Sequence, residues 1–244
     1  MIAQLGMYDR PGTTEANDHF YSMFRKALGR GPQALDRTTP LWDGWRSPDL
    51  LLSQTCGLPY REELHEITHL IGAPDYRNPG CPPGYYNSVI VVRADAKGQR
   101  LEDFHGQRLA YNEPESQSGW GAITTYAAAR DVRFGEHIGT GAHVNSARAV
   151  HDGRADVACI DVLSWRLMRR YDAYTENLRE IGRTEPTPAT PYLTGRQNDP
   201  EEIAAALETA IAQMGAETAD ILSIYGLSRV PHDAYMTLPV PPKP

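Results

Sequence analysis

Apolar and polar positions alternate along the chain in blocks that predict strands followed by helices. Residues Ile2–Tyr8 form a short apolar run, and residues Thr14–Leu28 carry apolar side chains three to four positions apart. The first pattern is typical of a strand and the second of an amphipathic helix. The segment Gly29–Pro32, rich in Gly and Pro, then ends the helix.

Three further apolar segments have strand character: Asp49–Ser53, Tyr86–Arg93 and Ala155–Asp161. Runs that are apolar without alternation are typical of strands covered on both faces, as in parallel or central strands. Helices are expected at Val162–Tyr171 and at Pro200–Met214, where Asp199 and Pro200 give a helix start. Strands that alternate with helices in this order predict an α/β fold with parallel pairing.

Two successive polar loops in the middle of the chain lead into predicted helices. The strand Leu109–Asn112 is followed by the loop Glu113–Gly119 and a helix that begins near Ser118. The loop Gly139–His143 opens a second helix. The first N–H groups of a helix are unpaired and carry the positive end of its dipole, so they bind small oxyanions without a cluster of Arg or Lys. The alternative is that Ser116 and Ser118 only cap the helix.

Composition and charge limit the classes of partner. The 244 residues are 41% hydrophobic, enough for one large domain or two smaller lobes. The net charge of −7 and the pI of about 5.6 argue against nucleic acid, which requires a basic face. A small anion stays compatible with this charge, because local dipoles bind it.

The three cysteines are scattered and odd in number, so they indicate no disulfide framework. No apolar run is long enough to cross a membrane. The segment before the first polar loop has no room for a signal peptide, so as written nothing exports the chain. A protein whose signal peptide had been removed would look the same, and the compartment stays open.

The segment His65–His69 matches H-E-x-x-H, the signature of zinc metalloproteases. That chemistry requires one helix carrying both histidines, and a third ligand. No further His follows within the next ~10 residues. The apolar residues Ile67, Leu70 and Ile71 fit a strand after a short helix equally well. Zinc hydrolysis through His65 and His69 is therefore kept as an alternative, and no metal is expected.

Several catalytic and nucleotide-binding motifs are absent from the sequence. It has no G-x-S-x-G, no Walker loop and no G-x-G-x-x-G after a strand. The chain thus offers binding groups without an evident nucleophile, so neither a catalytic residue nor a cofactor is expected.

Blocks spread over most of the chain, from about Met1 to Thr194, resemble one known family. They are Ser116–Gly119, Thr140–His143 and Ala149–Asp156, supported by Tyr8, Asp49–Gly57 and Tyr86–Arg93. In order and spacing they resemble the phosphate, phosphite and phosphonate substrate-binding proteins of ABC transporters, which have the type II periplasmic-binding-protein fold.

The resemblance implies two α/β lobes with mixed, mostly parallel sheets and a ligand cleft between the lobes. Lobe one would comprise residues 1–88 plus 190–244, and lobe two residues 89–189. The chain would cross near Tyr85–Val91 and return near Arg183–Tyr192, where the stiff proline-rich segment Thr184–Pro191 lies.

The same resemblance implies the residues that contact the ligand. The family's oxyanion-binding helix start corresponds to Ser116, Gln117 and Ser118, and its cleft histidine to His143. Gln117 replaces the small hydroxyl residue often found between the two serines, so the ligand is left open.

Further contacts are expected from lobe one and from the ends of strands. Tyr8 and one of Tyr85 or Tyr86 match aromatic positions of the family's pocket, and of the latter two we expect Tyr86 to contact the ligand. Gln54 and Thr55, from the polar exit of a strand, would approach the anion on closure. Asp161 falls near an acidic position used for a ligand amine or hydroxyl, and it fits a helix cap equally well.

The sequence therefore predicts a monomeric solute-binding protein that captures phosphate, phosphite or a phosphonate by lobe closure. Its expected partners are the small oxyanion and an ABC permease, with no nucleic acid and no membrane insertion. The family implies the periplasm. The alternative is a cytosolic enzyme or sensor on the same fold, with His143 and Asp161 as an acid/base pair.

Overall fold

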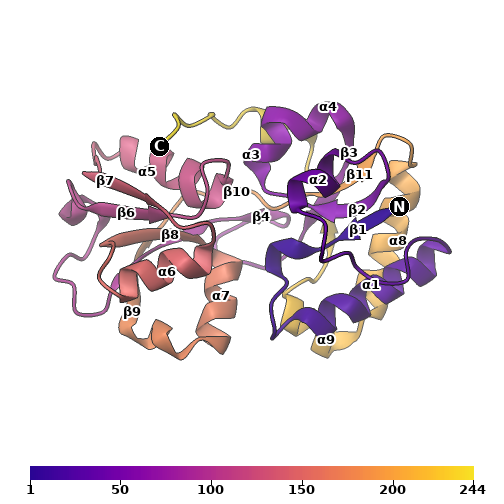
Figure 1. Ribbon diagram of the computed structural model, residues 1–244, viewed down its shortest axis with the longest axis horizontal. Coiled ribbons are helices and arrows are strands. Elements are labelled where there is room, and N and C mark those ends of the chain that lie inside the picture. Colours follow the sequence, from indigo (N-terminus) through magenta and orange to yellow (C-terminus); the bar gives the residue numbers. More distant parts are fainter. The chain divides into compact units, whose positions relative to one another are not determined.

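A computed structural model describes residues 1–244, which form two compact units (Figure 1). Unit 1 comprises Met1–Tyr85 and Pro188–Thr237, and unit 2 comprises Tyr86–Thr187 and Leu238–Pro244. The lobe boundaries expected from the resemblance stay a prediction, and they differ in placing the C-terminal residues in lobe one. None of the helices combines the length and the apolar character that crossing a membrane requires.

Unit 1 is built on a mixed five-stranded sheet of order β1-β2-β11-β3-β12. The strands are β1 (Ile2–Gln4), β2 (Leu50–Gln54), β3 (Thr68–Pro74), β11 (Tyr192–Gly195) and β12 (Leu227–Ser228). β1 pairs parallel with β2, whereas β11 runs antiparallel to both β2 and β3. β2 is buried along its whole length, as its unbroken apolar sequence predicts.

The longest helix of unit 1, α1 (Thr14–Leu28), has the predicted bounds. Phe20 and Phe24 of its apolar stripe are fully buried. Gly29 ends the helix with a φ of 74°, a left-handed conformation that glycine adopts at little cost.

The remaining helical segments of unit 1 are short at its N-terminal end and longer near the C-terminus. They are η1 (Gly6–Tyr8), α2 (Leu41–Arg46), α3 (Gly57–Pro59), η2 (Tyr60–Leu64), α4 (His65–Ile67), α8 (Pro200–Gln213), α9 (Gly215–Leu222) and α10 (His232–Met236).

The first strand is shorter than predicted. The sequence favours a strand to Tyr8, but β1 ends at Gln4, and Gly6–Tyr8 forms a 3₁₀ turn. Leu5 has φ −123° and ψ 46°, which turns the backbone out of the extended conformation. Leu5 is nevertheless buried, so the apolar pattern reports its burial rather than its secondary structure.

Unit 2 contains a second mixed sheet of order β7-β6-β8-β5-β9. Its strands are β5 (Ser88–Arg93), β6 (Arg108–Tyr111), β7 (Glu136–Gly139), β8 (Val157–Asp161) and β9 (Leu178–Arg183). β6 runs parallel to β7 and β8, whereas β5 is antiparallel to β8 and β9. β5 is therefore central and buried as predicted. It does not pair parallel, and more of the pairing in both sheets is antiparallel than the sequence suggests.

The helical segments of unit 2 cover this sheet. They are η3 (Leu101–Phe104), η4 (Gln117–Gly121), α5 (Ala122–Ala128), α6 (His143–His151), α7 (Val162–Tyr171) and η5 (Ala173–Asn177). α7 has the predicted bounds. Ile90, Val157 and Ile123 are fully buried in a core that also includes Trp120.

Two short strands mark where the chain passes from one unit to the other. β4 (Tyr85–Tyr86) and β10 (Thr187–Pro188) pair as a separate two-stranded sheet. The proline-rich segment 184–191 contains no helix, as its prolines predict.

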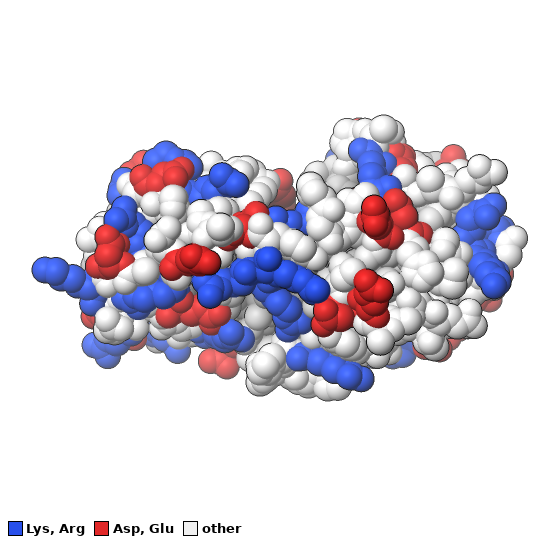
Figure 2. Space-filling view, turned by 90° about the horizontal axis from the view of Figure 1, so that it is seen from below, with Lys and Arg blue, Asp and Glu red and all other residues white.

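Charge is distributed unequally between the units. Unit 1 contains 10 Lys and Arg against 17 Asp and Glu, whereas unit 2 contains 14 of each. In Figure 2 basic and acidic side chains are interspersed over the left part of the view, which is unit 2. The net charge of −7 thus belongs to unit 1.

Candidate functional site

The predicted anion loop leads into a π-helical turn at the end of β6. Ser116 precedes the turn, and η4 (Gln117–Gly121) follows with a hydrogen bond from the Gly121 N–H to the Ser116 carbonyl. The Ser116 Oγ accepts from the Gly119 N–H at 3.0 Å, so Ser116 is the N-cap. Ser116, Gln117 and Ser118 are all buried. π-helical turns are rare and frequently occur at functional sites.

The second polar loop, Gly139–His143, is hydrogen-bonded to the same end of β6. The Thr140 N–H donates to the Tyr111 carbonyl at 2.9 Å, and the Gly141 N–H donates to the Asn112 carbonyl at 2.8 Å. These bonds hold the start of α6, and with it His143, beside η4. The sequence could place both loops at helix starts, but not the hydrogen bonds that join them.

Two of the predicted residues, Ser118 and Asp161, approach the same imidazole nitrogen of a third, His143. His143 Nε2 lies 3.0 Å from Ser118 Oγ and 3.4 Å from Asp161 Oδ2. The side chain of His143 is 13% exposed and that of Asp161 is 3% exposed. The structure thus brings together Ser118, His143 and Asp161, three residues that the sequence analysis proposed for the ligand site.

Asp161 has two tasks in the structure. Its Oδ1 accepts from the backbone N–H groups of Leu163 and Ser164 at 3.0 and 2.8 Å, which makes it the N-cap of α7. Its Oδ2 faces His143. Both roles considered from the sequence, cap and site residue, are therefore compatible.

Burial lowers the pKa of His143, and the nearby carboxylate of Asp161 and the carbonyl of Cys159 oppose that shift. The ring is thus neutral at pH 7 and carries a single proton. A carboxylate only accepts hydrogen bonds, so a bare Nε2 would face Asp161 lone pair to lone pair. With the proton on Nε2, the ring donates toward Asp161 and Ser118 Oγ. The Ser118 hydroxyl then keeps its own proton for a ligand oxygen.

This arrangement differs from a hydrolytic triad. In a Ser-His-Asp triad the serine and the carboxylate bind opposite nitrogens of the imidazole. Here Ser118 and Asp161 both approach Nε2. The geometry is therefore not that of a Ser-His-Asp triad, and the acid/base pair of His143 and Asp161 considered from the sequence stays a prediction.

The turn is packed tightly around Gly119. A Cβ atom at this position would overlap the Asn112 Oδ1 atom and lie 3.2 Å from His143 Cε1. Only glycine lets η4 approach the end of β6 this closely. At Gly121 a Cβ would meet only the end of the Gln117 side chain, at 3.3 Å.

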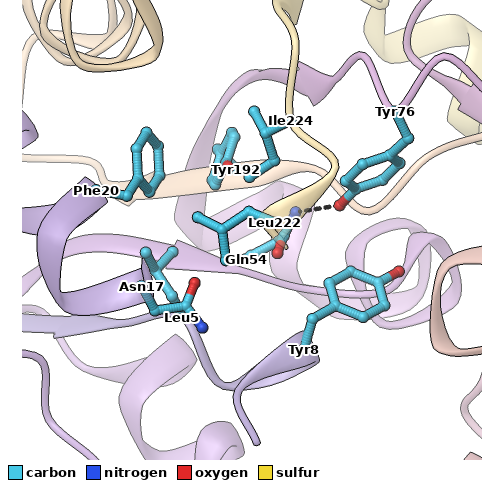
Figure 3. Close-up of a pocket in the computed structure, with 9 residues that line it drawn as sticks. All are labelled: Leu5, Tyr8, Asn17, Phe20, Gln54, Tyr76, Tyr192, Leu222 and Ile224. Atoms are coloured by element: carbon cyan, nitrogen blue, oxygen red, sulfur yellow. Dashed lines mark hydrogen bonds between the residues drawn. The ribbon is translucent and has the colours of Figure 1, made fainter. Parts of the chain in front are cut away.

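The predicted residues of unit 1, Tyr8 and Gln54, line a small cavity within that unit (Figure 3). The cavity encloses about 20 Å³, room for about one water molecule. The Gln54 amide donates to Tyr76 Oη at 2.9 Å and to Thr190 Oγ1 at 3.0 Å, so its amide hydrogens serve the fold. The Tyr8 ring packs edge-on against Tyr76, with centroids 5.9 Å apart. This cavity is too small for a phosphonate.

The other two predicted residues are also buried. Thr55 follows β2, and its N–H donates to the Pro191 carbonyl at 3.1 Å. Its hydroxyl has no hydrogen-bond partner. Tyr86 lies in β4, at the first chain crossing, and is 1% exposed.

The H-E-x-x-H segment does not form the helix that a zinc protease requires. α4 contains His65 and ends at Ile67, and β3 begins at Thr68 and contains His69. The zinc-hydrolase alternative based on this pair is therefore wrong, and the strand after a short helix is confirmed. Nowhere in the chain are three or more His, Cys, Asp or Glu side chains gathered around one metal position.

Two residues of the site were not singled out from the sequence as ligand-site residues. The Cys159 thiol donates to the Ser118 carbonyl at 3.3 Å, and burial raises its pKa to about 12, so it stays protonated. Asn112 supplies the carbonyl that holds Gly141 and the amide that packs on Gly119. The sequence does point to Asn112, because it directly follows β6 and polar residues at the ends of strands often form ligand-binding sites.

Comparison with known proteins agrees with this architecture. Residues 73–232 match a family model described as ABC transporter, phosphonate, periplasmic substrate-binding protein. No curated protein matches the chain.

Solved structures share the fold at low sequence identity. PhnD1 from Prochlorococcus marinus, in complex with methylphosphonate, is 15% identical with a TM-score of 0.76, over 96% of this chain and 93% of that one. A binding protein component of an ABC phosphonate transporter from Pseudomonas aeruginosa is 17% identical with a TM-score of 0.73, over 96% and 82%. The periplasmic VFT2 domain of BvgS from Bordetella pertussis is 16% identical with a TM-score of 0.60, over 91% of each chain. The type II periplasmic-binding-protein fold expected from the sequence is thus confirmed.

Proposed function

Because the chain belongs to the family of periplasmic substrate-binding proteins of phosphonate ABC transporters, we propose that it binds a phosphonate or a similar tetrahedral oxyanion at the start of η4. The transporter partner, an ABC permease, is part of this proposal and rests on the family. Capture by closure of the two units belongs to it as well, because a ligand that contacts both units only when they are closed shifts the population toward closure.

The observation that carries the proposal is the contact of Ser118 Oγ with His143 Nε2 at 3.0 Å, with Asp161 Oδ2 at 3.4 Å from the same nitrogen. If the ring proton is on Nε2, Ser118 accepts there and its own hydroxyl can donate to an anionic oxygen. The N–H groups and the dipole at a helix start favour an anion in general, although the Gly119 N–H is here taken by the Ser116 Oγ. Hydrogen bonds to a charged acceptor contribute about 1.5–3 kcal/mol each.

The expected ligand is a small tetrahedral oxyanion, as the family implies. Methylphosphonate, which PhnD1 of Prochlorococcus marinus holds in its structure, is the natural first probe, with inorganic phosphate as the second.

The test is isothermal titration of the whole chain with methylphosphonate and with inorganic phosphate. Ser118→Ala removes one hydrogen bond to the anion, so affinity should fall about 10- to 150-fold. Ser118→Asp places a negative charge where the anion binds and should abolish binding of both ligands. Ser22→Ala, which removes an exposed hydroxyl from α1, is the matched control and should bind as the wild type does.

Circular dichroism should give Ser118→Ala and Ser22→Ala the melting temperature of the wild type within a few degrees. Ser118→Asp buries a second carboxylate close to Asp161, so it should melt earlier and still show the far-UV spectrum of the wild type at the temperature of the titration. Normal binding by folded Ser118→Asp would place the anion site elsewhere and overturn the proposal.

A further inference from the structure

A second π-helical turn lies in unit 1, outside the proposed anion site, and it also leads to a histidine. η2 (Tyr60–Leu64) is followed directly by His65 of α4. The ring of His65 lies beside that of His232 in α10, with centroids 5.8 Å apart and planes inclined by 40°. The H-E-x-x-H segment thus meets a second histidine from a distant part of the chain, in place of His69.

Tyr60 contacts the Nδ1 atom of both rings. His65 Nδ1 lies 3.2 Å from the Tyr60 carbonyl oxygen, and His232 Nδ1 lies 2.9 Å from the Tyr60 hydroxyl. A carbonyl oxygen only accepts, so the proton of neutral His65 is on Nδ1 and its Nε2 carries a free lone pair. A hydroxyl can accept as well as donate, so His232 can adopt the same tautomer, with Nε2 free.

The separation of the rings suits one shared metal ion. Two imidazoles whose Nε2 atoms lie about 2.1 Å from one tetrahedral ion have ring centroids roughly 5–6 Å apart. The observed 5.8 Å falls in that range. Histidines that bind metals usually donate their other N–H to a carbonyl or a similar acceptor, which is the role of Tyr60 here.

Exposure at this place suits a cation. His65 is partly exposed and His232 is exposed, so an ion can reach both. Glu66 and Asp233, the residues that follow them, are exposed carboxylates, whereas the Arg196 guanidinium donates to the His65 carbonyl at 2.8 Å, so acidic and basic groups both lie nearby. Imidazole ligands select zinc, copper and nickel over magnesium and calcium.

We propose that His65 and His232 form a two-histidine binding site for a divalent ion of the zinc type. No third His, Cys, Asp or Glu completes the set, so water fills the remaining coordination positions. Tyr60 is a positioning residue that orients both rings. Bound metal joins α10 to the segment that follows η2.

The test is isothermal titration of the whole chain with zinc chloride at pH 7.5. The wild type should bind one zinc per chain, and His65→Gln and His232→Gln should each remove that event. His69→Gln is the matched control, since His69 belongs to the same sequence motif but lies in β3, and it should bind zinc as the wild type does. Tyr60→Phe removes the acceptor for His232 and should weaken binding about tenfold or more.

A second readout separates this site from the anion site. Zinc should raise the melting temperature of the wild type and of Ser118→Asp, but not that of His65→Gln. Methylphosphonate binding should be the same in His65→Gln as in the wild type. Zinc binding that is absent in the wild type, or unchanged in both His65→Gln and His232→Gln, overturns the inference.

Discussion

The two π-helical turns, η2 in unit 1 and η4 in unit 2, have the same backbone irregularity and opposite surroundings. All five residues of η4 are buried, and hydrogen bonds link its Ser118 to α6 and to β8. η2 carries the exposed Glu62 and leads to a partly exposed histidine pair. Glu63 of η2 forms an ion pair with Arg46, and both side chains are over 40% exposed.

The difference shows how the environment decides what a π-turn does. The extra residue in the turn moves the following side chains out of ordinary helical register. Around η4, whose five residues are all buried, those side chains meet a fixed set of partners, so the proposed anion site would be held in place before a ligand arrives. In η2 Tyr60, Arg61 and Leu64 are buried and Glu62 is exposed, and the same shift leads to the partly exposed His65.

Among the variants that test this comparison of the two turns, the largest effect is expected from adding one carbon atom to η4. Gly119→Ala forces the new Cβ against Asn112 and His143, which should cost about 1–3 kcal/mol of stability. Displacement of His143 should weaken methylphosphonate binding at least about tenfold. Gly121→Ala, in the same turn, places its Cβ 3.3 Å from the Oε1 of the buried Gln117, so it should cost less stability than Gly119→Ala. Thermal denaturation and calorimetry measure the two effects, and equal behaviour of the two variants would contradict the tight packing of η4.

A smaller effect is expected at Asp161, which links the turn to α7. Asn caps helices as well as Asp does, so Asp161→Asn should keep the melting temperature. Its amide would present a donor to His143 where the carboxylate oxygen accepts, and the orientation of Ser118 would be lost. Affinity should fall about 5- to 10-fold.

The ligand dependence of that loss separates positioning from direct contact. A positioning role predicts the same loss for methylphosphonate and for 2-aminoethylphosphonate. A much larger loss for the amine would show instead that Asp161 contacts it.

The smallest effect concerns the pH dependence of stability. Burial lowers the pKa of His143 from 6.5, so below that value the unfolded chain binds a proton that the folded chain does not. The stability that neutral His143 contributes is complete above pH 6.5 and is lost as the pH falls through its lowered pKa. Melting temperatures measured between pH 7.5 and 5 should therefore fall more steeply for the wild type than for His143→Gln. Parallel curves would show that the ring is not buried in its neutral form.

Local patterns predicted the regular elements well. The apolar stripe and the Gly29 stop give α1 its bounds, and Asp161 followed by an amphipathic stretch gives α7. The capping role considered as the alternative for Ser116 is present in the structure, because its Oγ accepts from the Gly119 N–H. The resemblance added the two-lobed fold, which local patterns alone do not contain.

Contacts between distant segments could not be predicted. Strand direction depends on the path between strands, which is why β5 pairs antiparallel although its composition suits a parallel strand. The meeting of Ser118, His143 and Asp161 was an expectation from the family, and the atoms that meet became visible only in three dimensions. The proximity of His65 and His232 could not be predicted either, because the sequence did not predict α10. Tyr60 contacts His65 through its backbone carbonyl and His232 through its hydroxyl, and no sequence pattern indicates such a pair of contacts.

The C-terminal residues have a consequence for dividing this protein into parts. The indole N–H of Trp120, which is 3% exposed, donates to the Pro242 carbonyl at 2.7 Å, and Leu238–Pro244 belongs to unit 2. Unit 2 is therefore not encoded by one continuous stretch of the gene. A fragment of residues 86–187 would leave this buried donor without its acceptor, at a cost of about 1–3 kcal/mol. An isolated unit 2 that folds well needs the last residues of the chain fused behind Thr187 through a short linker.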